Sequence, residues 1–433
     1  MADDIKDIAH AVDAASVMRL FASPPRMLAL GEPTHGVDAP LRLRNSLFRQ
    51  LVEQEGYRTI AVESDCVAGL LVDDYVTSGA GALDDVLERG FSHGFGTSAA
   101  SRELVCWMRA FNDGRPASDQ VRFAGFDGPL EMAWAASPRE TLTALHRTLA
   151  DHVDPGLLPC TAGTLDRLLG PDDRWTDPAA MLDPSASLGR SAEAGELRLL
   201  ADDLGALLHA WAPHLIAVAS RDAFDRARLW ARAASGLLRY HHWMADASPS
   251  RLARLTGLRD QMMADNLLAL AERGPVLVHA HNSHLQRDIS SMRMGGQRLE
   301  WWSAGAIVHT RLAEEYGFLA TAFGTMRHQG VDVPPPDTLE GALYALPAGT
   351  CLVDASASGA ALTATARRTS PYFGYAPLDP AHLARIDGIV FMKNVPEDWG
   401  CASRPRRDRA RTSGRVKGPP ARNSRAGPLL ITP

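Results

Sequence analysis

The sequence predicts an α/β fold in which a mixed or mostly parallel central sheet is flanked by helices. Short β-prone runs recur along the chain between stretches of helical periodicity, a pattern typical of α/β proteins rather than of β-sandwiches. Three of these runs end in Glu or His residues. The middle of the chain, about residues 135–272, is rich in Ala and Leu with Arg and Asp at helical spacing, which indicates a helical insertion or cap.

The first expected elements lead into a turn that carries an acid and an imidazole. Residues 5–24 have apolar side chains at helical spacing up to the break at Ser23-Pro24-Pro25, and they predict a helix. The apolar run Leu28-Ala29-Leu30-Gly31 then predicts a strand. This strand feeds a turn that holds Glu32 and His35. A strand followed by such a turn delivers acid–base groups to a cleft.

A helix over about residues 38–55 is expected to follow this turn. Asp38 is a suitable N-cap, and Pro40 fits the first helical turn, where a backbone N–H has no partner within the helix. Arg44 lies near the start of this helix, so we expect its side chain to point back toward the strand ends. Its fixed positive charge would then be available where an ester carbonyl develops an oxyanion.

Five further strands are expected along the chain. The run from Tyr57 ends in Glu63, and the run from Pro275 ends in the histidine cluster 279–284. The other three are residues 121–126, 350–354 and 388–392. In open α/β sheets the ligand crevice lies beyond the carboxyl ends of the strands. The three strands that end in titratable residues therefore predict a single site.

Composition and charge divide the chain into a domain, residues 1–401, and a basic tail, residues 402–433. The tail contains nine basic residues and one acid, which leaves 36 basic and 50 acidic residues in the body. An acidic body argues against nucleic acid as the natural ligand. Because the tail is rich in Pro, Gly, Ser and Arg, we expect it to be disordered, with a basic arm for RNA or an anionic surface as the alternative.

The chain is expected to be cytoplasmic. Its N-terminus lacks the basic and apolar regions of a signal peptide, and no stretch reaches the ~18 apolar residues of a membrane span. The five cysteines are scattered and never spaced as Cys-x-x-Cys, so neither a disulfide framework nor a zinc ribbon is indicated. The expected partner is a small molecule rather than a membrane or a nucleic acid.

A histidine beside carboxylates is suited to general acid–base catalysis. The pKa of an unperturbed imidazole lies near neutrality, so His35 can take a proton from water and return it to a leaving group. Glu32 or Glu63 would hold the tautomer of the ring and stabilise the imidazolium. His281 and His284 would bind the substrate or share the proton transfer.

These residues resemble the opening signature of the erythromycin esterase family, Gly-Glu-x-Thr-His-Gly followed by an Arg-containing helix and a strand that ends in Glu. Later motifs of the family occur in the same order, and the resemblance covers about residues 25–395. The matching residues are Gly31, Glu32, Thr34, His35, Gly36, Arg44, Glu63, Gly125-Phe126-Asp127, Arg259-Asp260, Met263-Ala264, Asn266 and His281-Asn282-Ser283-His284. One position departs from the family, which commonly has a Glu where this chain has Ala39.

The resemblance implies a hydrolase without metal or cofactor that opens a macrolide lactone or a related ester. The reaction would use a His-activated water and no covalent acyl-enzyme, and its biological role would be antibiotic inactivation or self-resistance. The resemblance assigns catalytic roles to His35, Glu32, Glu63 and Arg44. It assigns substrate binding to His281, His284, Asn282 and Asp127. The expected substrate is a bulky ester or macrolide-like natural product.

The sequence contains residues for two other kinds of site. The segment Gly90-Phe91-Ser92-His93-Gly94 matches the Gly-x-Ser-x-Gly elbow of α/β-hydrolases, but residues 84–89 before it are polar and helical where the elbow needs a strand. We therefore interpret this segment as a loop over the cleft. Glu32, His35, Glu63 and the pair His281 and His284 also provide donors for Zn²⁺ or Mn²⁺, although no compact His-Glu-x-x-His motif is present.

Two other functions are compatible with the same residues. A base that activates water can equally deprotonate a hydroxyl, so the site would also serve cyclisation or elimination on a natural-product intermediate, and Ala39 favours a substrate different from that of the family. From another class of protein, a non-catalytic binder would sequester a hydrophobic metabolite. The presence of every central titratable residue argues against the binder.

Overall fold

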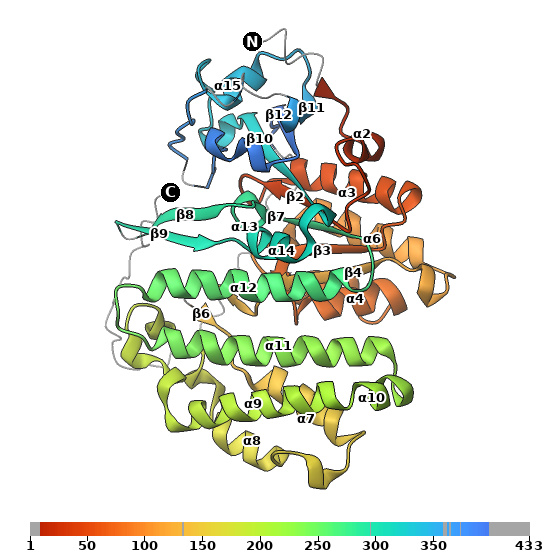
Figure 1. Cartoon of the computed structure of the whole chain (residues 1–433), viewed down its shortest axis with the longest axis vertical. Coiled ribbons are helices and arrows are strands. Elements are labelled where there is room, and N and C mark those ends of the chain that lie inside the picture. Colours follow the sequence, from red (N-terminus) through yellow and green to blue (C-terminus); the bar gives the residue numbers. More distant parts are fainter. Residues whose placement is uncertain are drawn as a thin grey trace, which may run out of the picture.

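An eight-stranded mixed sheet forms the centre of the molecule (Figure 1). The computed structural model describes residues 9–131, 134–294, 296–357, 362, 365–372 and 374–397. The strands follow the spatial order β1-β11-β12-β10-β2-β7-β3-β4. Their bounds are β1 Ala9–His10, β2 Met27–Glu32, β3 Thr59–Asp65, β4 Arg122–Asp127, β7 Val276–His281, β10 Tyr316–Thr325, β11 Thr350–Asp354 and β12 Gly388–Asn394.

The six strands from β12 to β4 run parallel to one another, whereas β11 runs antiparallel to both β12 and β1. The predicted mixed, mostly parallel sheet is therefore confirmed. β2 lies between β10 and β7 and pairs with both along its length. Because β2, β7, β3 and β4 are parallel neighbours, their carboxyl ends meet at one edge of the sheet.

Helices cover both faces of the sheet, whose strands are buried on both sides. Successive residues of β2 point to opposite faces: Leu28 and Leu30 pack in a core with α3, α4 and α6, whereas Met27 and Ala29 pack with α12, α14 and α15. The bounds of the helices around the sheet are α2 Ala14–Met18, α3 Asp38–Gln54, α4 Gly69–Ser78, α5 Leu83–Arg89, α6 Ala99–Asn112, α12 Arg251–Ala271, α13 Asn282–Leu285, α14 Ala304–Leu312 and α15 Leu339–Tyr344.

The middle of the chain is helical, as its periodicity predicted. It contains α7 Arg139–Ala150, α8 Ala162–Leu169, α9 Ala192–Ala210, α10 Ala212–Val218, α11 Arg221–Met244 and then α12. Helices α7 to α11 enclose a hydrophobic core of their own, separate from the two cores of the sheet. Figure 1 shows α11 and α9 stacked beyond α12, which contacts both β4 and α11. α12 therefore joins the helical layer to the sheet.

Two local expectations about the first helices were wrong. Within residues 5–24 the described part is helical only in α2, because residues 9–10 form β1 and pair with β11 at the edge of the sheet. Backbone pairing with an existing edge prevails there over the apolar period of the sequence. The N-cap of α3 is Val37 rather than Asp38, which is the first helical residue and accepts a hydrogen bond of 2.5 Å from the hydroxyl of Ser98.

Strand β10 and the hairpin of β8, Ile289–Met294, with β9, Gln297–Trp302, were not predicted from the sequence. β10 lies beside β2 near the middle of the sheet, and all ten of its residues are buried. Its sequence, Tyr-Gly-Phe-Leu-Ala-Thr-Ala-Phe-Gly-Thr, contains two Gly and two Ala residues, which are depleted in strands and weaken the β signal. Burial on both faces, rather than local propensity, makes this segment a strand.

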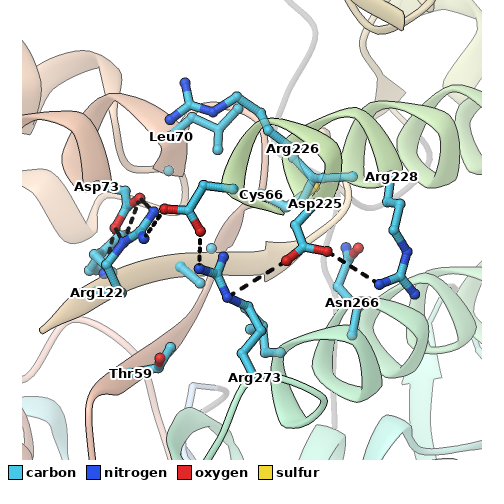
Figure 2. A pocket seen from close by; sticks show the side chains of 18 of the residues that line it. Thr59, Cys66, Leu70, Asp73, Arg122, Asp225, Arg226, Arg228, Asn266 and Arg273 are labelled. Atoms are coloured by element: carbon cyan, nitrogen blue, oxygen red, sulfur yellow. Dashed lines mark hydrogen bonds and ion pairs between the residues drawn. The ribbon is translucent and has the colours of Figure 1, made fainter. Parts of the chain in front are cut away.

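A cavity of about 90 Å³ lies between α4, β4, α11 and α12. Figure 2 shows the acids and arginines that line it. Arg122 pairs with Asp73 at 2.6 Å and with Asp222 at 2.9 Å, and Arg273 pairs with Asp222 and, at 3.8 Å, with Asp225. Because Arg122 begins β4, this cavity lies toward the amino ends of the strands. Its ion pairs tie the helical layer to the edge of the sheet.

No helix in the described part of the chain is both long and apolar enough to cross a membrane. The predicted basic tail, residues 402–433, lies outside the described residues.

Candidate active site

Glu32 and His35 reach the carboxyl edge of the sheet because β2 ends in a tight turn. Glu32 is the last residue of β2 and is fully buried, whereas the side chain of His35 is 36% exposed. Gly31 is required because a Cβ there would lie 2.0 Å from Oδ1 of Asn282, and Gly36 has a φ of 77°, a conformation that favours glycine. The turn therefore presents one imidazole to solvent and buries its carboxylate partner.

Imidazoles and carboxylates alternate across the strand ends in a line that we call the His/Glu row. The row connects β7, β2, the turn after β2, β3, α13 and α12, and its only substantially exposed member is His35. Successive nitrogen–oxygen distances along the row are 3.2, 2.7, 3.7, 3.4 and 3.0 Å for His279, Glu32, His35, Glu63, His284 and Asp260. The row links a buried network of charge to one imidazole that solvent can reach.

Glu32 and His35 stabilise each other's charge. Burial alone would raise the pKa of Glu32, but His279 and His35 outweigh it and lower that pKa to about 2. Burial opposes the imidazolium of His35, but the charge of Glu63 and the hydrogen bond from Nδ1 to Glu32 raise its pKa to about 9. The resting site therefore holds His35 mainly as the imidazolium at neutral pH.

Glu63, which the sequence places among the site residues, contacts two histidines of the row and Arg259. Its Oε1 lies 3.7 Å from Nε2 of His35 and 3.4 Å from Nε2 of His284, and it accepts a hydrogen bond of 3.1 Å from Arg259. Its Oε2 accepts the backbone N–H of His281 at 2.8 Å. Burial favours the neutral acid, but the surrounding positive charges prevail and hold the pKa of Glu63 well below its usual range.

The pKa values of the two histidines of the later motif are shifted in opposite directions. Nδ1 of His284 lies 3.0 Å from both oxygens of buried Asp260, and although burial opposes the charge, Asp260 and Glu63 raise the pKa of this ring. His281 accepts the N–H of Ser283 at Nδ1, so its Nε2 donates to the carbonyl of Pro33 at 3.2 Å. Burial, with the nearby charge of His35, lowers the pKa of His281 to about 4. His281 is thus a neutral ring with both nitrogens engaged.

Asn282 and Asp127 lie at the site but bind other parts of the protein. The amide of Asn282 bonds both the carbonyl and the N–H of Thr321 on β10, at 2.9 and 3.2 Å, and fixes α13 to the sheet. Asp127 ends β4, is fully buried and forms a two-point pair with Arg259, with its closest contact at 2.7 Å. Asn282 and Asp127 thus fix the elements that surround the site: Asn282 holds α13 against β10, and Asp127 holds α12 against β4.

Arg44 is buried inside the start of α3, only 1% exposed. Its Nε and Nη2 donate to Asn45, and its Nη1 has no hydrogen-bond partner. Burial lowers the pKa of Arg44 to about 10, against the favourable charges of Glu32 and Asp38. Ala39, at the position that departs from the family, packs beside the cluster around Tyr375.

Four residues in the site were not predicted as site residues from the sequence: His279, Arg259, Asp260 and His93. His279 belongs to the histidine cluster 279–284 but lies inside β7 and faces the interior, and its Nε2 is 3.2 Å from Glu32. Arg259 and Asp260 lie side by side on α12, and the motif that contains them was a usable signal. His93 lies in the loop after α5, with its ring centroid 6.5 Å from that of His35.

Ser92 does not occupy a nucleophile elbow. Its loop follows α5 rather than a strand, as its polar lead-in indicated. The hydroxyl oxygen accepts the N–H of Asp65 at 2.9 Å and lies 2.7 Å from Nδ1 of His93. Within the described residues, no group of three His, Cys, Asp or Glu side chains is arranged to hold a metal ion.

The fold and this site define an α/β protein with a histidine–carboxylate centre at the carboxyl edge of a parallel sheet. Residues 52–395 match the erythromycin esterase family. The chain belongs to this family, and membership supports a hydrolase. Its expected resemblance to the family is therefore confirmed.

Individual relatives are distant. The chain is 25% identical to erythromycin esterase type I of Escherichia coli over 307 residues, which cover 66% of this chain and 70% of that protein. It is 29% identical to erythromycin esterase type II of Escherichia coli over 112 residues, only 26% of each protein. A solved variant of the erythromycin esterase EreC in its open conformation has a TM-score of 0.59 and 20% identity, covering 85% of this chain and 90% of that one, and supports the fold.

Proposed function

We propose that the protein hydrolyses a macrolactone or a related bulky ester by using His35 as the base that activates water. The observation that carries this proposal is the position of His35, the one well-exposed imidazole of the His/Glu row, between two buried carboxylates. The names of the family and of its relatives support a cyclic ester as the substrate.

The mechanism follows from the two nitrogens of His35. Glu32 accepts the hydrogen bond of Nδ1 at 2.7 Å and so fixes the ring with Nε2 on the side of Glu63, 3.7 Å from its Oε1. Nε2 takes a proton from water while the water oxygen attacks the ester carbonyl. The imidazolium returns that proton to the alkoxide that leaves, so one water is consumed and an acid and an alcohol form. Glu63 stabilises the imidazolium between the two steps.

The buried cations supply the surrounding field rather than direct contacts with substrate. Arg44 lies in the protein interior and balances the charge of Glu32, and Arg259 does the same for Asp127 and Glu63. Neutral His281 lies beside His35, with 5.5 Å between ring centroids. We infer that these residues fix the charge of the carboxylates and that water reaches only the base.

Mass spectrometry of erythromycin incubated with the purified protein tests the proposal. We expect a product heavier by one water, unaffected by EDTA and absent with His35→Ala. The matched control is His328→Ala, an exposed histidine outside the row that should leave the rate unchanged. Loss of activity with EDTA would restore the metal-site hypothesis. A product of unchanged or reduced mass would favour cyclisation or elimination, and binding without turnover that persists in His35→Ala would favour the sequestering protein.

A further inference from the structure

The loop between α5 and α6 holds a second imidazole in the site under backbone strain. His93 has a φ of 56°, a left-handed conformation that costs free energy for any residue with a Cβ and that clusters at functional sites. The loop is pinned to the end of β3, because the N–H of Ser92 donates to the hydroxyl of Ser64 at 2.8 Å and Ser92 accepts the N–H of Asp65. The strained conformation is therefore fixed beside Glu63.

The partners of His93 determine which ring nitrogen carries the proton. Arg259 is always protonated and has no acceptor, so its contact of 3.2 Å with Nε2 requires Nε2 to accept. The ring is then neutral with its proton on Nδ1, which donates to the hydroxyl oxygen of Ser92 at 2.7 Å. Burial lowers the pKa of His93 and favours this neutral form. Ser92 thus accepts a hydrogen bond from this histidine, whereas a nucleophilic serine must donate its own proton to a base.

Arg259 has more acceptors than hydrogens at one nitrogen. Its Nη2 carries two hydrogens but lies 2.7 Å from Asp127, 3.1 Å from Glu63 and 3.2 Å from Nε2 of His93. Asp127 also binds Nε of Arg259 and is the closest acceptor, so it keeps one Nη2 hydrogen. Glu63 and His93 share the other.

We propose that His93 is a positioning residue for the base. Its Nε2 competes with Glu63 for one N–H of Arg259, so less of the negative charge of Glu63 is compensated and Glu63 holds the proton of His35 more strongly. The charged and titratable groups around His93 come from five different segments. They are Glu63 on β3, Asp127 on β4, Glu131 on β5 (Leu130–Glu131), Arg259 on α12 and His35 in the turn after β2. Among these, Arg259 is the group that His93 and Glu63 contact together.

The tautomer of His93 is the first test and is measured on the wild-type protein. Nitrogen-15 NMR of the histidine rings in the full chain distinguishes a protonated from a bare ring nitrogen. We assign the signal of His93 by its absence in His93→Gln, and we expect its proton on Nδ1 at neutral pH. A proton on Nε2 would overturn the proposal, because Arg259 could not donate to that atom.

The second test measures the pKa of His35 by NMR titration of the wild type and of two variants. His93→Leu removes the acceptor, gives the N–H of Arg259 wholly to Glu63 and should lower the pKa of His35 by about one unit. His93→Gln is the matched control, because its amide oxygen can still accept from Arg259, and it should shift this pKa much less. An unchanged or higher pKa in a folded His93→Leu variant would overturn the proposal.

Both measurements concern protonation in the free protein. They remain decisive if His93→Leu fails to fold, since the tautomer of the wild type alone can refute the idea. The catalytic consequence of His93 rests on the proposed role of His35 as the base. The failure of erythromycin hydrolysis would remove that consequence but would leave the NMR results unaffected, so the two proposals fail separately.

Discussion

Glu63→Gln is the substitution that most directly tests how the His/Glu row prepares its base. Glutamine has the shape of glutamate and can still accept the N–H of His281, but it removes the charge that contributes most to the raised pKa of His35. Only the neutral ring can take a proton from water. The pH at which activity reaches half its plateau should therefore measure the pKa of His35, and its change in Glu63→Gln should measure how much Glu63 raises that pKa.

The size of the shift follows from the distance between the two groups. At 3.7 Å and an effective dielectric constant of about 20, two unit charges interact with about 4.5 kcal/mol, or about three pKa units, as an upper limit. The side chain of His35 is 36% exposed, so solvent screens much of this interaction. We expect the pKa to fall by about one unit from its value of about 9, which makes the neutral ring about tenfold more abundant at pH 7.

The assay is kcat/KM for erythromycin opening as a function of pH. In the wild type, activity should rise about tenfold per pH unit through neutrality and level off near pH 9, where His35 loses its proton. In Glu63→Gln the plateau should begin about one pH unit lower, because the pKa of His35 is lower. The plateau rate should also be smaller, because the imidazolium formed in the reaction is no longer stabilised by the charge of Glu63. A wild-type plateau that begins near pH 6.5, or a midpoint that stays in place in the variant, would refute the reasoning.

Three further predictions concern stability. Gly31→Ala should destabilise the protein by about 1–3 kcal/mol in urea unfolding, because its Cβ has no room, whereas Gly195→Ala, in an open position of α9, should stabilise it by about 0.5–1 kcal/mol; equal effects would contradict the packing argument. Asp260→Ala should cost about 3–5 kcal/mol by leaving the buried imidazolium of His284 without its carboxylate, and a loss below about 1 kcal/mol would show that this ring is neutral. The pKa of His35 is raised on folding, so its contribution to stability is complete below pH 6.5 and is lost as the pH rises through about 9; a pH series of unfolding curves for the wild type and His35→Gln should show this loss only in the wild type.

The parts of the fold that the sequence predicted are those with a strong local signal. The turn after β2 could be predicted because an apolar run ends at Glu32 and His35, and β3 and β7 were predicted in the same way. β4 was predicted from its β-prone run alone. The long helices of the middle region follow from a sustained helical period. Periodicity reports which side of an element is buried, so it works where an element has one clear environment.

The parts that the sequence could not predict depend on contacts between distant segments. β10 is a strand because β2 and β12 flank it, and its Gly and Ala residues carry little information about that environment. His279 faces Glu32 only because β7 is inserted next to β2, a pairing that joins residues far apart in the chain. The role of Arg259 likewise depends on where α12 crosses the ends of β3 and β4.

The position of β2 in the sheet has a consequence for how the protein is made. Both neighbours of β2 come from the second half of the chain: β7 begins at Val276 and β10 at Tyr316. A ribosome that has released β2 must therefore synthesise the whole segment from α3 to α12 before the strand that carries Glu32 can pair with β7. Such long-range pairing slows folding. The turn that carries Glu32 and His35 thus leaves the ribosome long before β7 and α13, and the nascent chain has no assembled His/Glu row until those two elements have been made.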